Sequence, residues 1–340
     1  MAEGIASVTG ERAVAVGARP VLVRWTAPDA LSNLVSVLEL AADGQMRYSA
    51  STRRPTAATV KLVEDVLVAG DFYDSGEPIA AFAWPLLIQV GGLAVLARGD
   101  DPPRPPREGM ARGDDPSKTP RGHPATRLEL SARGRAALAR PSYEALGALW
   151  ARWLGSVSTD ELARIEAIKG QRKPGTLTSA ISRRAAVAAA LAAMQPGAWT
   201  GAGKLLASLR AQQQPPLVAA RSLRALWRLY VVDSYFGSLG HAGSRTWDLV
   251  EGRYALCVLF EYAATLGLVD VAYTDPRGAR DDYRALWGAD QLSCLSRYDG
   301  LSAVRVNELG AAVLHDPDAL PSLGLPVPRG VIPRPTGNRS

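Results

Sequence analysis

Three short segments carry residue types that could act on a phosphate or an acyl group. Residues 199–206 contain the Gly-Lys pair of a phosphate-binding loop, but Ala198 stands where its first glycine belongs and Leu205 where a hydroxyl would bind Mg²⁺. Residues 169–176 have the glycine spacing without the lysine, which favours a basic linker. Residues 236–244 gather glycine, serine and histidine but lack the Gly-x-Ser-x-Gly turn of a serine hydrolase. We therefore expect neither a nucleotide-binding loop nor an esterase.

Metal and acid–base chemistry find no better support. His241 stands near Asp233 and Asp248 in the sequence, but a single histidine in a loop is usually a surface residue. Four glutamates fall on expected helices without a histidine at metal-ligand spacing: Glu161, Glu166, Glu251 and Glu261. The two cysteines, Cys257 and Cys294, are too few for a disulfide framework or a zinc site. We predict that the chain is not an enzyme and has no metal site and no cofactor.

The composition is that of a helix-rich globular protein with a basic balance. Of the 340 residues, 47% are hydrophobic and only 6% are aromatic, which favours helices over a β-sandwich. Lysine and arginine outnumber aspartate and glutamate by 39 to 33, and this net charge of +6 points to an anionic partner. The longest apolar stretch, residues 79–96, is interrupted by Pro85 and two glycines, and the N-terminus lacks a signal-peptide pattern. We expect a cytoplasmic protein without membrane contact.

Apolar periodicity and turn residues predict the elements of the first half. Helices are expected over residues 31–41, 56–70 and 79–90, and strands over 46–49, 93–97 and 126–130. Ser131 is expected to cap a further short helix. Between the last two strands, the segment 97–110 is duplicated at 111–124. Its proline, glycine and charge content predicts a disordered loop over residues 98–125.

The second half repeats landmarks of the first. The segment 128–138, LELSARGRAAL, matches 304–314, VRVNELGAAVL, at an offset of 176. An earlier Gly-Leu pair, at 92–93, matches 267–268 at an offset of 175. Near-constant spacing between two separate landmarks indicates a duplicated module. The expected elements here are helices over 183–194, 205–209, 223–231 and 247–266 and strands over 269–273 and 301–306.

The order helix, strand, helix, helix, strand, loop, strand resembles that of a winged-helix domain. The segment 128–138 is similar to the second wing strand and following helix of many bacterial winged-helix proteins. The resemblance implies a mainly α protein with small β-hairpins (α+β), in which two winged-helix modules are joined by a helical linker. The expected division is an N-terminal extension (1–30), module 1 (31–140), a linker (141–179) with helices over 143–154 and 159–168, module 2 (180–316) and a disordered, basic, proline-rich tail (317–340).

A DNA-contacting role would draw on clustered cations. Residues 204–228 carry five lysines and arginines and no acidic residue. Two arginine pairs stand at the starts of expected helices, where backbone N–H groups could also hold a phosphate. Three arginines of the tail, at 329, 334 and 339, could add salt-sensitive contacts. The predicted DNA-binding residues are Lys204, Arg210, Arg221, Arg224, Arg228, Arg53, Arg54, Arg183 and Arg184.

The expected third helices argue against direct reading of a base sequence. Residues 79–90 contain no lysine or arginine, and residues 248–266 carry three acidic residues against Arg253 alone. Two hypotheses follow. In the first, the chain is a regulator or accessory factor that binds duplex DNA with weak specificity through phosphates. In the second, it is a protein-interaction scaffold or accessory subunit, with a homodimer as one form.

The scaffold hypothesis depends on the apolar faces of the third helices. Such faces suit burial against a protein partner or against each other. Large aromatic residues would anchor the partner, or else belong to the core: Trp84, Trp227 and Trp247.

Overall fold

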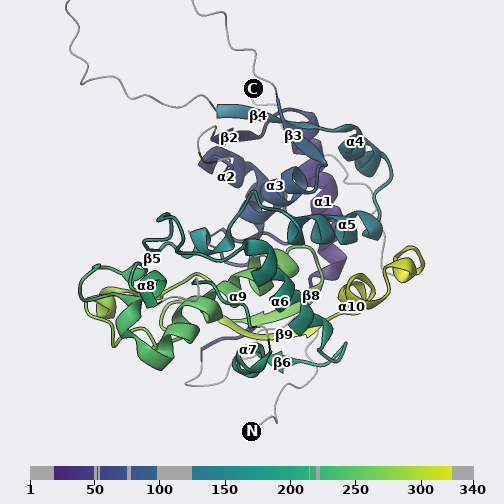
Figure 1. The fold of residues 1–340 in the computed structure, drawn as a ribbon. Coiled ribbons are helices and arrows are strands. Elements are labelled where there is room, and N and C mark those ends of the chain that lie inside the picture. Colours follow the sequence, from purple (N-terminus) through teal and green to yellow (C-terminus); the bar gives the residue numbers. More distant parts are fainter. Residues whose placement is uncertain are drawn as a thin grey trace, which may run out of the picture.

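The computed structural model of the chain describes residues 19–49, 52, 54–74, 78–97, 125–213, 215–219 and 223–323. Helices combine with small antiparallel sheets, which confirms the expected mixture of the two (Figure 1). The loop expected over residues 98–125 lies outside the described residues except for its last position, and the tail lies outside them beyond residue 323. In the described ranges, no helix combines the length and the apolar character that crossing a bilayer requires.

The first half folds around a three-stranded antiparallel sheet with the strand order β2-β4-β3. Its elements are α1 (Ala27–Ala42), β2 (Arg47–Ser49), α2 (Ala57–Val66), α3 (Ala80–Val90), β3 (Ala94–Leu96), β4 (Ala125–Leu130) and α4 (Ala132–Ala139). The predicted elements are all present. However, α1 begins four residues earlier than expected, with a proline in its first turn, where the missing N–H costs no hydrogen bond.

The second half carries a four-stranded antiparallel sheet with the order β1-β8-β9-β6. Its elements include α6 (Ala180–Ala192), β6 (Thr200–Gly201), α7 (Ala202–Ala211), η4 (Asp248–Gly252), α9 (Arg253–Cys257), η5 (Val258–Ala263), β8 (Val269–Tyr273), β9 (Leu301–Val306) and α10 (Glu308–His315). Here η4 and η5 are π-helical turns that precede and follow α9 without a break. We call residues 248–263 the central helix. This confirms the long helix predicted in this region.

The two halves repeat each other in strand register and in helix capping. Ala94 pairs with Leu130 between β3 and β4, and Val269 pairs with Val306 between β8 and β9, at the offsets seen in the sequence. The following helices are capped alike. The N–H of Gly134 donates to the side chain of Ser131, and the N–H of Gly310 donates to the side chain of Asn307, each at 3.0 Å. The matched sequence landmarks therefore occupy equivalent positions.

A glycine in the first turn of each capped helix lies against the backbone of the residue that precedes β3 or β8. A Cβ placed on Gly134 would come within 2.0 Å of the Leu93 carbonyl oxygen, and one on Gly310 within 1.9 Å of the Leu268 oxygen. No side chain fits at such distances. Both glycines are therefore required by the close approach of helix and backbone, and this explains why the duplicated segment retains them.

Residues 22–24 of the expected N-terminal extension form an edge strand of the second sheet, whereas residues 1–18 lie outside the described residues. The strand β1 (Leu22–Arg24) pairs with β8, in the other half of the chain, with Leu22 opposite Tyr273. Thr26 strengthens this join, because its hydroxyl donates to the Val269 carbonyl at 2.7 Å. The boundary expected at residue 31 is therefore wrong: it cuts α1 and separates β1 from its sheet.

A third, two-stranded sheet takes the place of most of two predicted helices. The helix over residues 143–154 is confirmed as α5 (Tyr143–Leu154), but residues 159–168 form only the 3₁₀ turn η1 (Glu161–Arg164) before β5 (Ile168–Lys169). Likewise, the helix expected over 223–231 is reduced to α8 (Leu223–Leu226), followed by β7 (Tyr230–Val231). The strands β5 and β7 pair with each other. Local apolar periodicity cannot reveal a strand partner some sixty residues away.

The start of the expected tail is ordered. The 3₁₀ helix η7 (Pro317–Ser322) packs on α10 and α5, and Leu320 is buried. The side chain of Leu320 lies against Gly147 of α5. The boundary at residue 317 is therefore too early, because Leu320 and Leu323 pack this stretch against the core.

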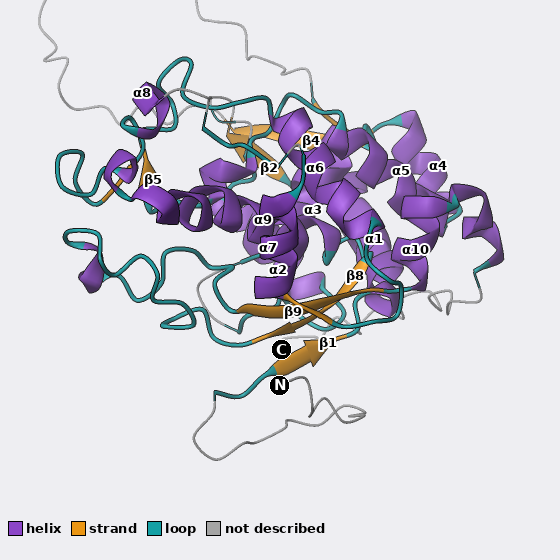
Figure 2. Cartoon of the chain, turned by 60° about the horizontal axis from the view of Figure 1, so that its bottom comes forward, coloured by secondary structure: helices purple, strands orange, loops and turns teal. Residues whose placement is uncertain are grey.

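The two expected third helices, α3 and the central helix, are buried where the halves meet. Residues 80–88 of α3 and residues 249–263 of the central helix are all buried, Trp84 among them. The helix α3 contacts η5 directly, and Phe72 packs edge-on against Phe260 with 4.8 Å between ring centroids. Figure 2 shows these helices on one side of the strands β1, β8 and β9. The apolar third helices thus pack against each other.

Arg164 of η1 joins both third helices. Its Nε lies 2.9 Å from each carboxylate oxygen of Glu261 in the central helix. Its terminal nitrogen donates to the carbonyl of Pro78 at 2.7 Å, and its guanidinium lies 3.5 Å from the centre of the Phe82 ring in α3. One linker side chain therefore makes polar and cation–π contacts with both halves.

Replacement of either capping-turn glycine tests the repeated close approach. We expect Gly134→Ala and Gly310→Ala each to lower the free energy of unfolding by about 1–3 kcal/mol or more, because the added methyl overlaps a backbone oxygen. The matched control is Gly203→Ala in α7, where nothing lies within 4 Å of an added Cβ. It should be neutral or slightly stabilising in urea titrations. Equal destabilisation by all three would contradict the steric explanation.

Candidate nucleic-acid interface

Two of the predicted DNA-binding residues belong to the protein core. Arg183 is 1% exposed and forms a bidentate pair with Asp160, at 3.0 and 2.6 Å. Arg184 is fully buried, where its Nε and one terminal nitrogen donate to Glu161 at 3.0 and 2.7 Å. Neither guanidinium can reach a phosphate. The prediction is wrong for this pair because the start of a helix can be buried. Here Asp160 and Glu161, which precede the helix, form ion pairs with both arginines.

Other arginines and carboxylates of the core also form ion pairs. Arg253 of the central helix donates to Asp299 at 3.0 Å and also pairs with Asp282. Glu161, which pairs with Arg184, also accepts from the hydroxyl of Tyr254 at 3.1 Å. These groups are neutralised in place, as buried charges must be. Within the described residues, no three histidine, cysteine, aspartate or glutamate side chains gather as a metal site would require.

The remaining predicted cations are dispersed. Lys204 is exposed on α7, and Arg210 lies 3.5 Å from Asp248 on the same half of the chain. Arg54 is half-buried and donates to the Ala163 carbonyl at 3.4 Å. Arg53 and Arg221 lie outside the described residues. The predicted set therefore does not form one continuous strip.

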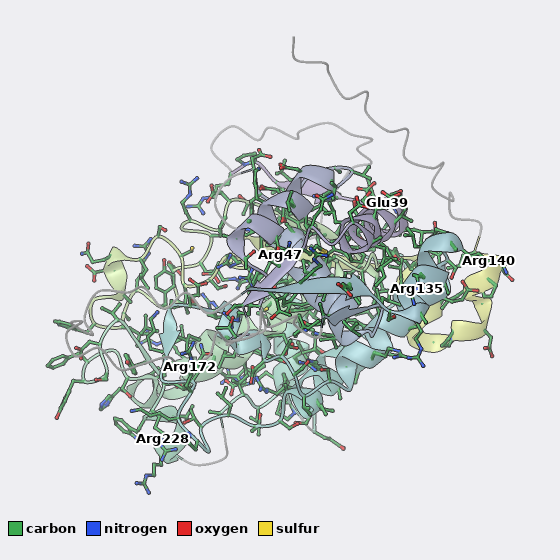
Figure 3. All side chains as sticks on the ribbon, turned by 90° about the horizontal axis from the view of Figure 1, so that it is seen from above. Glu39, Arg47, Arg135, Arg140, Arg172 and Arg228 are labelled. Atoms are coloured by element: carbon green, nitrogen blue, oxygen red, sulfur yellow. The ribbon has the colours of Figure 1, made fainter. Side chains whose placement is uncertain are left out.

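Arg228, by contrast, contacts a second basic segment, which was expected to be only a linker, and Arg224 lies four residues before Arg228 in the sequence. This segment contributes Lys169, Arg172 and Lys173, all exposed. We call these five residues the basic lobe: Lys169, Arg172, Lys173, Arg224 and Arg228. In Figure 3, Arg172 and Arg228 lie at the same end of the molecule, away from Arg135 and Arg140. Two stretches more than fifty residues apart thus supply one cationic surface.

Backbone contacts bring the two segments of the basic lobe together. Lys169 pairs with Tyr230 in the ladder of β5 and β7. Gly170 then turns with φ 83°, and a Cβ on it would lie 1.8 Å from the Arg228 carbonyl oxygen. Arg228 completes the join by donating to the Pro174 carbonyl at 2.6 Å. Only glycine allows this approach, so the KGQR turn is built to dock on the chain around Arg228.

The basic lobe is electrostatically uncompensated. Among the described residues, none of its five cations forms an ion pair, whereas the buried arginines are all matched to carboxylates. Four of the five side chains are exposed, and only Arg228 is half-buried. Uncompensated like charges repel each other and attract a polyanion. The signal for this site was the charge of residues 169–173 rather than their glycine spacing.

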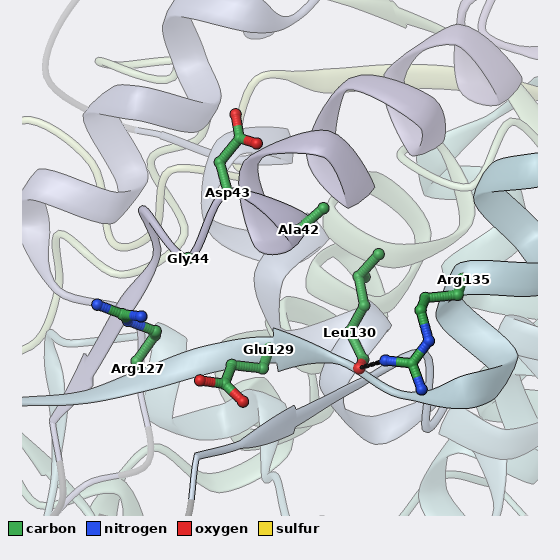
Figure 4. Close-up of a pocket in the computed structure, with 7 residues that line it drawn as sticks. All are labelled: Ala42, Asp43, Gly44, Arg127, Glu129, Leu130 and Arg135. Carbon is green, nitrogen blue, oxygen red and sulfur yellow. Dashed lines mark hydrogen bonds between the residues drawn. The ribbon is translucent and has the colours of Figure 1, made fainter. Parts of the chain in front are cut away.

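Two depressions in the surface have different chemistry. A hollow of about 280 Å³ lies between the end of α1 and β4 (Figure 4). It combines Arg127 and Arg135 with Asp43 and Glu129, so its charges offset one another. A groove of about 560 Å³ runs along α5, α6 and α10 and has an apolar lining, which includes Trp150, Leu154, Ala188, Val313 and Leu320. Neither surface offers a concentration of cations.

The histidine considered as a general base is an aromatic packing residue. His241 is exposed in the 3₁₀ turn η2 (Leu239–His241), and its ring lies edge-on to that of Trp227 at 4.0 Å between centroids. Trp227 is 46% exposed, whereas Trp247 is half-buried under the guanidinium of Arg210.

Comparison with known proteins adds no relative, because no family model, curated protein or solved structure matches this chain.

Removal of a core arginine tests the structural role of the buried pairs. Arg184→Ala leaves the Glu161 carboxylate buried without its partner, and we expect a loss of about 3–5 kcal/mol in the free energy of unfolding. The control is Lys61→Ala, which removes a cation from an exposed pair with Glu64 and should leave the urea midpoint unchanged. A folded Arg184→Ala variant of wild-type stability would refute the structural role.

Glu251 makes stability depend on pH. Burial raises the pKa of this carboxyl to about 7, although the N–H of Val218 donates to it at 3.1 Å. Between the unfolded pKa of about 4.3 and pH 7, the folded state binds more protons, so the free energy of unfolding should fall as the pH rises. We expect Glu251→Gln to remove a difference of about 3 kcal/mol across this window. Urea titrations from pH 5 to pH 8 measure it, and parallel pH curves for the two proteins would rule it out.

Proposed function

We propose that this chain is a non-enzymatic nucleic-acid-binding protein built from two winged-helix modules, which contacts phosphates through the basic lobe. The element order of both halves supports the winged-helix assignment. In each half the strand that follows the first helix lies beside the last strand of the sheet, as in β2-β4-β3 and in β8-β9-β6. The tight glycine contact and the capped helix recur after each last strand.

The third helices do not enter a DNA groove in this proposal. A winged helix that reads sequence places its third helix in the major groove, with polar side chains directed at base edges. Here α3 and the central helix are buried against each other, so neither has a face for DNA. The same burial removes the surface that a scaffold built on these helices would use. Binding is therefore weakly specific and driven by phosphate charge.

The observation that carries the proposal is the convergence of five cations on the basic lobe without a carboxylate partner among the described residues. A structural role does not require uncompensated charge, because the core arginines of this chain all have partners. Phosphates of a nucleic acid would supply the missing anions to an exposed cationic patch of this kind.

Charge removal from the lobe tests the proposed function. We expect the triple variant Lys169→Ala/Arg172→Ala/Lys173→Ala to bind a 20-base-pair random duplex about tenfold to a thousandfold more weakly in low salt. The slope of log affinity against log salt should become shallower by about one for each phosphate that the variant leaves unneutralised. Fluorescence anisotropy with a labelled duplex, titrated at several salt concentrations, measures both.

A variant with the same loss of charge controls for general electrostatics. Arg133→Ala/Arg135→Ala/Arg140→Ala removes three exposed cations around α4, at the opposite end from Arg172 and Arg228 (Figure 3). It should retain most of the affinity and the wild-type salt slope. If both triple variants weaken binding equally, net charge rather than the basic lobe holds the duplex. If neither does, the proposal fails.

A further inference from the structure

Three large aromatic side chains project into solvent beyond the basic lobe. Tyr235 is 82% exposed, Phe236 61% and Trp287 60%. Their rings form a chain, with 6.4 Å between the centroids of Tyr235 and Phe236 and 4.9 Å between those of Phe236 and Trp287. We call these three residues the aromatic cluster. Grouped exposed rings of this size mark an interaction surface rather than ordinary surface composition.

The loop that carries two of the rings is held in place by hydrogen bonds. The carboxylate of Asp233 accepts from the N–H of Tyr235 at 2.7 Å and from that of Phe236 at 3.1 Å. The N–H of Gly237 donates to the Asp233 carbonyl, and its own carbonyl accepts from Val231. A Cβ on Gly237 would lie 1.8 Å from the Val231 oxygen, so only glycine closes this loop. The rings are therefore presented by a fixed backbone.

The same loop contains an unfavourable backbone conformation. Val232 adopts φ 64°, the left-handed region that a β-branched residue avoids, and it is the only residue other than glycine with positive φ among the described residues. Its side chain is 51% exposed and lies against Gly288, beside Trp287. This contact joins the two loops that carry the cluster. Backbone strain of this kind, in a loop that holds exposed aromatic rings, is typical of a binding site.

The aromatic cluster is continuous with the basic lobe. The strand β7 runs directly from Arg228 into the loop at Val232, and its first residue, Tyr230, pairs with Lys169. The chain therefore passes from cations that can contact phosphates to a loop that presents rings able to stack on bases. This combination of a cationic track and aromatic faces is how proteins hold single strands without reading their sequence.

We propose, building on the nucleic-acid binding proposed above, that the preferred ligand is a single strand whose bases stack on Phe236, Trp287 and Tyr235. In a duplex, base faces are covered by neighbouring pairs, so exposed rings gain nothing from it. In a single strand the faces are free, and stacking on each ring adds to the phosphate contacts of the lobe. The positive charge beside the rings favours this ligand over a protein partner of neutral surface.

Binding of a 20-nucleotide oligo(dT) and of a 20-base-pair duplex, both labelled, tests the inference on the full-length protein. We expect the wild type to bind the single strand more tightly. Phe236→Leu/Trp287→Leu should weaken oligo(dT) binding about tenfold to a hundredfold and change duplex binding less than about twofold, since duplex contacts are to phosphate. The control is Val157→Ser, which replaces an 86% exposed apolar residue elsewhere and should change neither.

The outcomes separate this inference from the proposed function. If the aromatic variant loses single-strand and duplex affinity equally, or loses neither, the stacking role is overturned while the phosphate role of the basic lobe can still hold. If it instead changes the oligomeric state measured by light scattering, with oligo(dT) affinity intact, the cluster is a protein interface and the inference is wrong. Failure of the Lys169→Ala/Arg172→Ala/Lys173→Ala variant to weaken either ligand would overturn the proposed function itself.

Circular dichroism melts establish that the aromatic variant is folded. Both replaced side chains are mostly exposed, so we expect its melting temperature to match that of the wild type. Tyr235→Ser, at the most exposed position of the cluster, provides a second variant with little risk to the fold. Its oligo(dT) affinity should also fall, and wild-type affinity in every folded cluster variant would overturn the inference.

Discussion

The contact between Arg164, Glu261 and α3 is the constraint on which the rest of the structure depends. Two helices that could each have been a recognition surface are instead buried together, and their few charges must be neutralised without water. Arg164 does this from the linker, by pairing with Glu261 while it lies over Phe82. Because the third helices are taken up by the core, any ligand must be met elsewhere. The cations of the basic lobe lie outside this core, and in the function proposed above they are the ones that contact phosphates.

The same helix-capping arrangement occurs at two places in the chain, in different surroundings. Ser131 and Asn307 differ in side chain, yet each accepts from the N–H of a glycine three residues later. Each glycine lies against a carbonyl oxygen of the residue that precedes β3 or β8. The two central strand pairs keep the same register, and the segments between them are nearly equal in length but differ in sequence. The two copies therefore share the contacts of the backbone rather than those of the surface.

Local signals in the sequence predict much of this fold but little of the site. Caps, glycine turns and apolar periodicity locate α2, α3, α4 and α5, because each of these helices depends on neighbours a few residues away. The strand pairs β1–β8 and β5–β7 escape such prediction, because their partners lie far along the chain. For the same reason, the sequence pattern predicts that Arg183 and Arg184 are accessible. In the structure, ion pairs with Asp160 and Glu161 hold them in the core. The basic lobe requires the fold to join its two halves.

The strand β1, near the start of the described residues, pairs with a strand that comes about 250 residues later. Leu22 lies opposite Tyr273, so the polypeptide closes on itself across both units. During synthesis, β1 emerges from the ribosome long before its partner β8. Pairing of these two strands is therefore a late and slow step of folding. It also means that cleavage in the connecting region would not release two self-sufficient pieces. The upstream fragment would carry away β1, which is the edge strand of the downstream fragment's sheet.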